Sequence, residues 1–184
     1  HLLEEEQLQE NTAATHAWLK DFRAFYKGLR PDAFMVGEVW SSVEESARYV
    51  NDGEMDLVFN FPLAEDIIAA ASGASSFKLN NTLAASERTF DPGNYAPFLS
   101  NHDQTRTMTR LNDNEMKAKT AASILLTSPG TPFIYYGEEI GMTGSKPDPS
   151  LRTPMQWDDT KDAGFTSGVP WSSVKLDYAE KNVK

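Results

Sequence analysis

The sequence predicts an α/β fold with a parallel sheet, and two observations lead to this prediction. Short apolar runs alternate along the chain with segments of helical periodicity, which is the pattern of consecutive βαβ units. Polar residues follow two of these runs directly, where parallel α/β folds place their functional groups. From the pattern alone, both a small doubly wound domain and a part of a larger fold remain open.

The composition of the chain argues against several classes of protein. The 184 residues suffice for one domain with a hydrophobic core, and no apolar run approaches the roughly 20 residues that span a bilayer. The formal net charge of -10 argues against a nucleic-acid partner, because an acidic surface repels phosphate, whereas a neutral ligand meets no such penalty. Without cysteine there is no disulfide framework or thiolate metal site. The three histidines lack metal-ligand spacing, and no strand leads into a glycine-rich phosphate loop.

The first predicted helix begins near Asn11, a plausible N-cap, and ends at Gly28 before Pro31. Its apolar residues recur at helical spacing and form one face, which consists of Trp18, Phe22, Phe25, Tyr26 and Leu29. A buried strand is predicted over residues 34–39, with Glu38 at its C-terminal end.

The alternation of helices and strands then continues. Ser42 and Glu45 have the spacing of a capping box, which predicts the start of the next helix. The remaining strands are predicted over residues 56–61, 95–100 and 132–136, and the remaining helices over 63–71, 76–88 and 115–127. From Met142 onward the chain is rich in proline, glycine, aspartate and tryptophan, which indicates a loop segment.

Two carboxylates lie where chemistry is expected. Glu38 follows an apolar strand, and partial desolvation there would suit a general acid. Asp103 follows the third strand beside Asn101 and His102, whose hydrogen bonds would favour the ionised form. Two carboxyl groups in such different environments are typical of a glycosidase site. Strand-end acids also cap the helices that follow them, and the pattern alone leaves that interpretation open.

Four segments resemble motifs of the α-amylase family of glycoside hydrolases, in the family's order. Residues 34–40 (FMVGEVW) are similar to the fifth-strand motif, and residues 98–103 (FLSNHD) are similar to the seventh-strand motif. Residues 130–142 (GTPFIYYGEEIGM) resemble the eighth strand and its loop. Residues 152–158 (RTPMQWD), with 163–166 and 170–171 beyond them, resemble the barrel-exit segment of α-glucosidases, oligo-1,6-glucosidases and closely related amylases.

This resemblance implies the C-terminal half, strands five to eight, of a TIM (β/α)8 barrel. Residues 1–141 would form that half barrel, and residues 142–184 the exit segment towards a C-terminal β domain. The family's nucleophilic aspartate, in a G-F-R-x-D-x-x-x-H motif, would then lie about four residues before His1. We therefore expect the isolated fragment to be inactive, and to pair with the N-terminal half or with a second copy of itself.

The resemblance also implies roles for individual residues. Glu38 matches the general acid/base and Asp103 the transition-state stabiliser of a retaining double displacement. His102 matches a histidine that binds the sugar at the cleavage point. Arg106 would orient Asp103 or contact the sugar, although a solvated arginine at a helix start is an equal alternative. Arg152 lies in a motif that faces the cleft, and His1 matches an acceptor-side histidine or is the remainder of a tag.

The implied substrates are α-glucans or maltooligosaccharides. No cofactor is expected in this fragment, while calcium is expected to be an option in the complete enzyme. An α-glucosidase, and a transglycosylase or isomerase of the same family, remain alternatives because the same carboxylates serve both outcomes. A non-catalytic transporter ectodomain of the family is disfavoured, since such proteins have generally lost these carboxylates. The sequence leaves cytoplasmic and secreted locations open.

Overall fold

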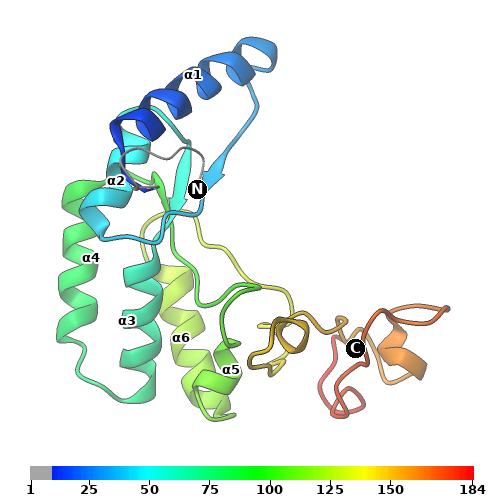
Figure 1. The fold of residues 1–184 in the computed structure, drawn as a ribbon. Helices are drawn as coiled ribbons and strands as arrows, with labels where there is room; N and C mark the ends of the chain where they lie inside the picture. The colour runs from blue at the N-terminus through cyan, green and yellow to red at the C-terminus, as the bar shows by residue number, and fades with distance from the viewer. Residues whose placement is uncertain (1–9) are drawn as a thin grey trace. The chain divides into compact units, whose positions relative to one another are not determined.

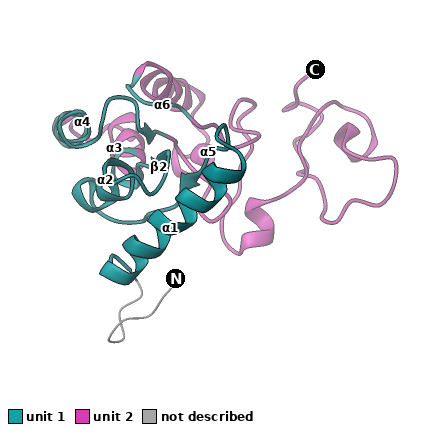
Figure 2. Cartoon of the chain, turned by 90° about the horizontal axis from the view of Figure 1, so that it is seen from above, with its two compact units in different colours: residues 1–63, 77–97, 128–132 teal, residues 64–76, 98–127, 133–184 magenta. Residues whose placement is uncertain are grey.

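The computed structural model describes residues 10–184, which divide into two compact units. Figure 1 shows the elements along the chain, and Figure 2 colours the units. Within the described residues, unit 1 comprises 10–63, 77–97 and 128–132, and unit 2 comprises 64–76, 98–127 and 133–184. The expected division at residue 141 does not coincide with these units, because both draw on several stretches of the chain. That division stays a prediction.

Unit 1 contains a three-stranded parallel sheet with the order β1-β2-β3. The strands are β1 (Val36–Gly37), β2 (Leu57–Phe59) and β3 (Tyr95–Ala96). Val36 is paired with Leu57 and Val58 with Tyr95, and both pairings are parallel. Helices occur between consecutive strands, so the predicted βαβ pattern is confirmed for these three strands.

The prediction of a fourth strand is wrong. Residues 132–136 contain no strand, although Thr131 donates its backbone N–H to the carbonyl of Tyr95 at 3.0 Å. Pro97 and Pro132 both lack an N–H, which limits the hydrogen bonds that these two segments can exchange. The apolar sequence favours a strand, but residues 132–136 do not form one.

The first helix, α1 (Ala13–Leu29), is capped by Thr12 and not by Asn11. The Thr12 hydroxyl accepts the backbone N–H of Thr15 at 3.1 Å. Asn11 has a φ of 56° and is engaged by Tyr49, whose hydroxyl donates to Asn11 Oδ1 at 2.7 Å. The residue expected to cap the helix is thus held by α2 (Val43–Asn51) instead.

Asp56, just before β2, connects α1 to the start of the sheet. Its carboxylate accepts hydrogen bonds from Arg23 at 2.7 Å and from the backbone N–H of Met35 at 2.9 Å, and it lies 3.2 Å from Lys27 Nζ. Burial alone would raise the pKa of Asp56, but these hydrogen bonds outweigh it and leave the pKa below 3.8. A single carboxylate therefore joins three backbone segments of unit 1.

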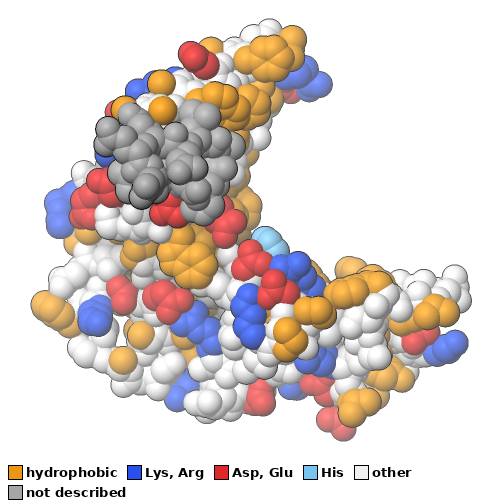
Figure 3. Space-filling view, viewed as in Figure 1, with side chains coloured by type: hydrophobic (Ala, Val, Ile, Leu, Met, Phe, Trp, Pro, Cys, Tyr) orange, Lys and Arg blue, Asp and Glu red, His pale blue; other side chains and the backbone are white. Residues whose placement is uncertain are grey.

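The apolar face predicted for α1 is present but largely exposed. Figure 3 shows hydrophobic side chains gathered over this helix. Phe25 and Leu29 are 65% and 67% exposed, whereas the buried residues of the helix are Thr15, His16 and Leu19. His16 Nδ1 lies 2.9 Å from the fully buried carboxylate of Glu54. The helix thus packs through a partly polar face and leaves its apolar face open.

Two further helices pack in unit 1. Helix α2 begins after Ser42, whose hydroxyl accepts the N–H of Glu45 at 3.2 Å, which confirms the predicted cap. It contacts β2 and α4 (Phe77–Thr89). Between β2 and α4, the amide of Asn60 donates to the Ser86 hydroxyl at 2.8 Å, so the strand end is tied to α4 by a buried hydrogen bond.

Unit 2 contains most of α3 (Phe61–Ser72) and all of α5 (Thr107–Arg110) and α6 (Glu115–Thr127). Helix α6 has the predicted bounds, and α5 was not predicted. Arg110 at the end of α5 donates two hydrogen bonds to the carboxylate of Glu65 in α3, at 2.9 and 2.5 Å. Two 3-10 helices follow, η1 (Asp148–Leu151) and η2 (Lys161–Gly164). None of the described helices has the length and apolar character that crossing a membrane requires.

Candidate active site

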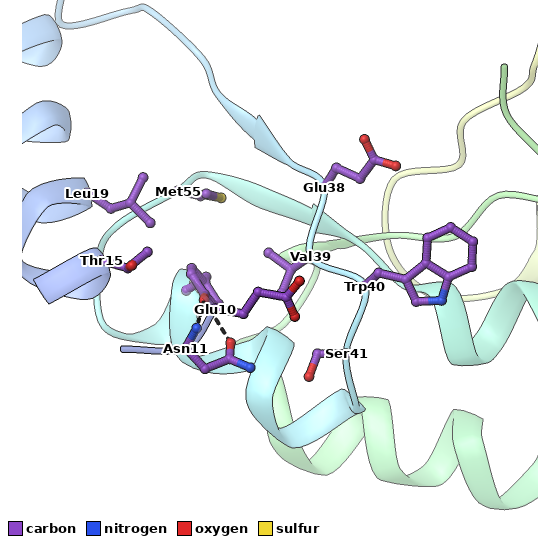
Figure 4. A pocket seen from close by; sticks show the side chains of 10 residues that line it. Glu10, Asn11, Thr15, Leu19, Glu38, Val39, Trp40, Ser41 and Met55 are labelled. Carbon is purple, nitrogen blue, oxygen red and sulfur yellow. Dashed lines mark hydrogen bonds between the residues drawn. The ribbon is translucent and has the colours of Figure 1, made fainter. Parts of the chain in front are cut away.

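Glu38 directly follows β1 in unit 1 and is exposed. A Cβ atom on the preceding Gly37 would lie 1.9 Å from Met55 Sδ, so a larger residue there would require the Met55 side chain to shift. Glu38 lines a pocket of about 320 Å³, to which Asn11, Leu19 and Tyr49 also contribute. In Figure 4 the side chains of Glu38 and Trp40 extend to one side of the chain and that of Val39 to the other.

The exposure of Glu38 differs from the partial desolvation expected of it. Its aromatic neighbour Trp40 is also 63% exposed, but one ring face is covered. Phe61, itself buried, stacks on Trp40 with the ring centroids 4.6 Å apart and an interplanar angle of 16°. Glu38 therefore projects from a rigid strand end beside an anchored aromatic ring, with its carboxyl accessible to a ligand.

Asp103 is the centre of a polar cluster in unit 2. One carboxylate oxygen, Oδ1, lies 2.6 Å from Nη2 of Arg152, and the other, Oδ2, lies 3.3 Å from Nε2 of His102. Arg152 also donates from Nε to the carbonyl of His102 at 3.0 Å. The backbone N–H of Asp103 donates to Asn101 Oδ1 at 3.0 Å. Three predicted site residues, His102, Asp103 and Arg152, are thus in direct contact.

Asp148 joins this cluster and was not predicted from the sequence. Its Oδ2 lies 3.1 Å from Nη2 of Arg152, and its Oδ1 is paired with Lys146. The hydrogen bond from Lys146, with the charges of Lys146 and then Arg152, lowers the pKa of Asp148 below 3.8. The i, i+4 spacing of Asp148 and Arg152 is the one sequence signal that pointed to this pair.

Glu138 fixes both ends of the segment that carries Asp103. Its Oε1 accepts hydrogen bonds from the hydroxyls of Ser100 at 2.8 Å and Thr107 at 2.5 Å, and Oε2 accepts the backbone N–H of Tyr135 at 3.2 Å. Burial raises the pKa of Glu138 above 4.5, although all three donors favour its charged form. The role of Glu138 is therefore structural, since it holds the loop that carries Asp103.

Arg106 is placed differently from the expectation that it contacts a sugar or Asp103. The residue is fully buried, with Nε bonded to the carbonyl of Leu151 at 3.0 Å and Nη1 to that of Tyr136 at 2.6 Å. Its guanidinium lies 4.5 Å from the ring centroid of Tyr135 and 4.7 Å from that of Tyr136. Arg106 therefore joins the Asp103 segment to the chain around residues 135–151 and presents no surface to a ligand.

The other site predictions have simple outcomes. His1 lies outside the described residues. Glu38 belongs to unit 1, and the cluster around Asp103 belongs to unit 2. Within residues 10–184, no group of three or more histidine or acidic side chains has the arrangement of a metal site. Calcium in a complete enzyme stays a prediction.

Comparison with known proteins gives consistent matches. The family model described as "Alpha amylase, catalytic domain" matches residues 2–184. Alpha-amylase 3 of Dictyoglomus thermophilum is 36% identical over 176 residues, which are 90% of this chain and 35% of that protein. An oligo-1,6-glucosidase of Parageobacillus thermoglucosidasius is 37% identical over 128 residues, 47% of this chain and 23% of that protein.

Among solved structures, the crystal structure of the alpha-amylase from H. orenii aligns with a TM-score of 0.83 and 37% identity. The alignment covers 97% of this chain and 37% of that one. The chain thus spans about a third of the length of the alpha-amylases that it matches.

Proposed function

The chain belongs to the alpha-amylase catalytic-domain family of glycosidases, and on this premise we propose that it forms strands five to eight of the catalytic barrel of an enzyme that cleaves α-glucosidic bonds. The motif order supports this position, because the segments around Glu38 and Asp103 match the family's fifth and seventh strands. The proposed substrates are α-glucans and maltooligosaccharides.

The observation that carries this proposal is the cluster around Asp103. A stabilising carboxylate must be held in a fixed orientation while it accepts hydrogen bonds from a sugar. Arg152 binds one oxygen of Asp103, and His102 approaches the other at 3.3 Å. The Asp103 side chain keeps 38% of its surface exposed, so it is held from one side and open to a ligand on another.

The proposed reaction is a retaining double displacement. An aspartate of the complete enzyme, upstream of His1, attacks the anomeric carbon and expels the leaving sugar. Protonated Glu38 donates its proton to the departing glycosidic oxygen. Its carboxylate then takes a proton from the incoming water, whose oxygen attacks the anomeric carbon and breaks the bond to the aspartate. Asp103 binds sugar hydroxyls and stabilises the oxocarbenium-like ring. Without the upstream nucleophile the first step cannot occur, so the 184-residue chain alone is proposed to be inactive.

Product analysis with maltoheptaose tests the proposal in the parent protein. Glu38→Gln is expected to lower the rate about 10²-fold or more. Glu44→Gln, an exposed acid on the neighbouring α2, is the matched control and should leave the rate unchanged. Early mixtures of short maltooligosaccharides that disappear in Glu38→Gln support an amylase. Full activity of Glu38→Gln, or turnover by the isolated 184-residue chain, would contradict the proposed roles.

A second candidate function is an α-glucosidase of the same family. The segment 152–158 favours it, since this segment resembles the barrel exit of α-glucosidases and oligo-1,6-glucosidases. Stepwise release of glucose from maltoheptaose would identify this activity. Appearance of products longer than the substrate would instead identify a transglycosylase. Absence of any cleavage by the wild type would favour a non-catalytic relative.

We also propose that the isolated chain self-associates through α1. The exposed apolar residues Phe25 and Leu29 are one helical turn apart and lie on the same face. Exposed contiguous apolar surface of this kind is typical of protein interfaces.

A further inference from the structure

Residues 144–152 of unit 2 form a loop that carries Asp148 and Arg152, and we call this segment the Arg152 loop. Its two ends lie against each other, because a Cβ atom on Gly144 would lie only 2.5 Å from the carbonyl oxygen of Ser150. Glycine at residue 144 allows this close approach. The place of Arg152 therefore depends on how the two ends of the loop are held.

Arg106, which directly precedes α5, binds both ends of the Arg152 loop. Its backbone N–H donates to the carbonyl of Gly144 at 2.9 Å, and its side-chain Nε donates to the carbonyl of Leu151 at 3.0 Å. Thr109 in α5 adds a third bond, because its hydroxyl accepts the N–H of Gly144 at 2.9 Å. One short segment of the chain therefore fixes the start and the end of the loop.

The guanidinium of Arg106 is held firmly in place. It is fully buried, its Nη1 donates to the carbonyl of Tyr136, and the rings of Tyr135 and Tyr136 lie against it. Its acceptors are uncharged carbonyls, and Nη2 has no hydrogen-bond partner among the described residues. Burial of a charge in this way is costly, and apolar side chains of similar volume often stabilise a protein equally well. Stability alone therefore does not explain an arginine here, whereas the fixed directions of its donors do.

The contact between Arg106 and Leu151 leads directly to the candidate catalytic cluster. Arg152 follows Leu151 in the chain and holds Asp103 at 2.6 Å. Asp103 in turn belongs to the same short segment as Arg106. The four residues thus form a closed ring of contacts, in which residues 103–106 are bonded to two consecutive residues of the loop. Two such bonds fix the rotation of the loop end as well as its distance.

We infer that Arg106 is a positioning residue, which fixes the Leu151 carbonyl and thereby sets the place from which Arg152 orients the Asp103 carboxylate. Arg106 itself contacts no substrate, because it is fully buried. The inference rests on the proposed function for the role of Asp103 in the reaction. Misplacement of a reacting or stabilising group by about 1 Å can lower a rate about 10²-fold, so a residue behind the site can control the rate.

Arg106→Lys in the parent protein tests this role. Lysine keeps the positive charge but lacks the planar fork that bonds two carbonyls at once. With maltoheptaose as substrate, we expect kcat to fall about tenfold and KM to change less than about twofold, because the loss concerns a contact of the transition state. Arg110→Lys, at the arginine of α5 that pairs with Glu65, is the matched control and should keep the kcat of the wild type.

A double-variant cycle distinguishes positioning from general support of the fold. If Arg106 acts through Arg152, the double variant Arg106→Lys/Arg152→Lys should be no slower than Arg152→Lys alone. If Arg106 only supports the fold, the two losses of kcat should multiply, and this result would overturn the inference. An unchanged kcat in Arg106→Lys would overturn it as well.

Thr109→Val provides a second variant if Arg106→Lys does not fold. It removes only the hydroxyl that accepts the Gly144 N–H and leaves the Arg106 guanidinium intact. We expect a smaller loss of kcat, which should disappear when Arg152 is already lysine. A loss of the same size in that background would contradict a route through Arg152.

The link between the two arginines is also measurable without catalysis, in the 184-residue chain. Arg152 donates from Nε to the carbonyl of His102 at 3.0 Å, so this N–H should exchange slowly with water and give its own heteronuclear NMR signal. Arg152→Lys identifies the signal by removing it. In Arg106→Lys the signal should shift and exchange faster, whereas that of Arg110 should stay unchanged. An Arg152 signal that does not respond to Arg106→Lys would refute the link.

The outcomes separate this inference from the proposed function. A parent without glycosidase activity, in a protein whose Arg152 signal depends on Arg106, would refute the proposed function and keep the link between the arginines. An active parent in which Arg106→Lys keeps full kcat would keep the proposed function and refute the positioning role. Circular dichroism of each variant verifies the fold.

Discussion

Arg152 and Asp103, 49 residues apart in the chain, form an ion pair in which Nη2 lies 2.6 Å from Oδ1. Their side chains are 40% and 38% exposed, so solvent screens the attraction and the pair adds little to stability. Its effect is geometric, because the same guanidinium also donates from Nε to the carbonyl of His102. Because the Arg152 guanidinium is planar and its donors point in fixed directions, it sets the orientation of the Asp103 carboxylate relative to the backbone of His102.

Arg152→Lys is therefore expected to lower the activity of the parent protein more than its stability. Lysine keeps the charge but loses the fork that bonds His102 and Asp103 together. We expect kcat to fall about 10- to 100-fold, with little change in the midpoint of thermal unfolding. Arg48→Lys, at the exposed pair with Glu45 on α2, is the control and should change neither quantity. Equal activity of Arg152→Lys and the wild type would show that Asp103 does not need this orientation.

Glu138 predicts a pH dependence of stability. Because burial raises its pKa in the folded state above 4.5, the native protein binds more protons than the unfolded chain between 4.5 and the raised value. The contribution of Glu138 to stability therefore decreases as the pH rises through this window. Glutamine does not titrate, so the stability of the wild type relative to Glu138→Gln should fall as the pH rises from 4.5.

Urea unfolding of the two proteins at several pH values measures this difference. Glu139→Gln, at the exposed neighbouring residue, should show no comparable trend. A constant or rising difference between the wild type and Glu138→Gln would contradict the burial of the Glu138 carboxylate.

Asp56 predicts a dependence of the opposite sign. Its pKa lies below 3.8 in the folded state, so the stability that it contributes is present above 3.8 and is lost as the pH falls. Asp56→Asn should cost about 1–3 kcal/mol at neutral pH, because Arg23 and Lys27 lose a charged partner. The difference should shrink in acid.

Chemical denaturation followed by circular dichroism reports this loss. Asp32→Asn, at a fully exposed pair with Arg30, is the control and should have little effect at any pH. If Asp56→Asn were as stable as the wild type at neutral pH, this result would contradict the proposal that Asp56 stabilises the contact between α1 and the sheet.

The exposed face of α1 predicts association of the isolated chain. The double change Phe25→Gln and Leu29→Gln should lower the mass that light scattering measures at high protein concentration, because it removes exposed apolar surface. Asp21→Asn, an exposed polar change on the same helix, should leave the mass unchanged. A wild type that stays monomeric at high concentration would refute self-association.

Local signals predicted much of the fold. Helix α6 occupies the predicted residues 115–127, and Ser42 caps α2 as its capping-box spacing indicated. The choice of Thr12 over Asn11 as a cap depends on Tyr49, a contact across 38 residues that no local pattern contains. Pro132 was visible in the sequence and was outweighed by the apolar residues after it, although a missing N–H limits a strand whatever its hydropathy.

Residue types and motifs predicted which residues belong to the candidate site, but they did not predict how these residues contact one another. His102, Asp103 and Arg152 were expected in the site, but their direct contact depends on how the chain between them, which includes α5 and α6, returns residue 152 to residue 103. Arg106 was expected near the sugar because it follows Asp103 closely. Its burial between Tyr135 and Tyr136 is set by packing across about 30 residues. Sequence position does not reveal such enclosure.

The interleaving of the two units has a genetic consequence. Membership changes after residues 63, 76, 97, 127 and 132, so no single cut in the gene separates one unit from the other. Truncation at any one position therefore divides at least one of the two units. A fragment long enough to contain one intact unit therefore always carries part of the other.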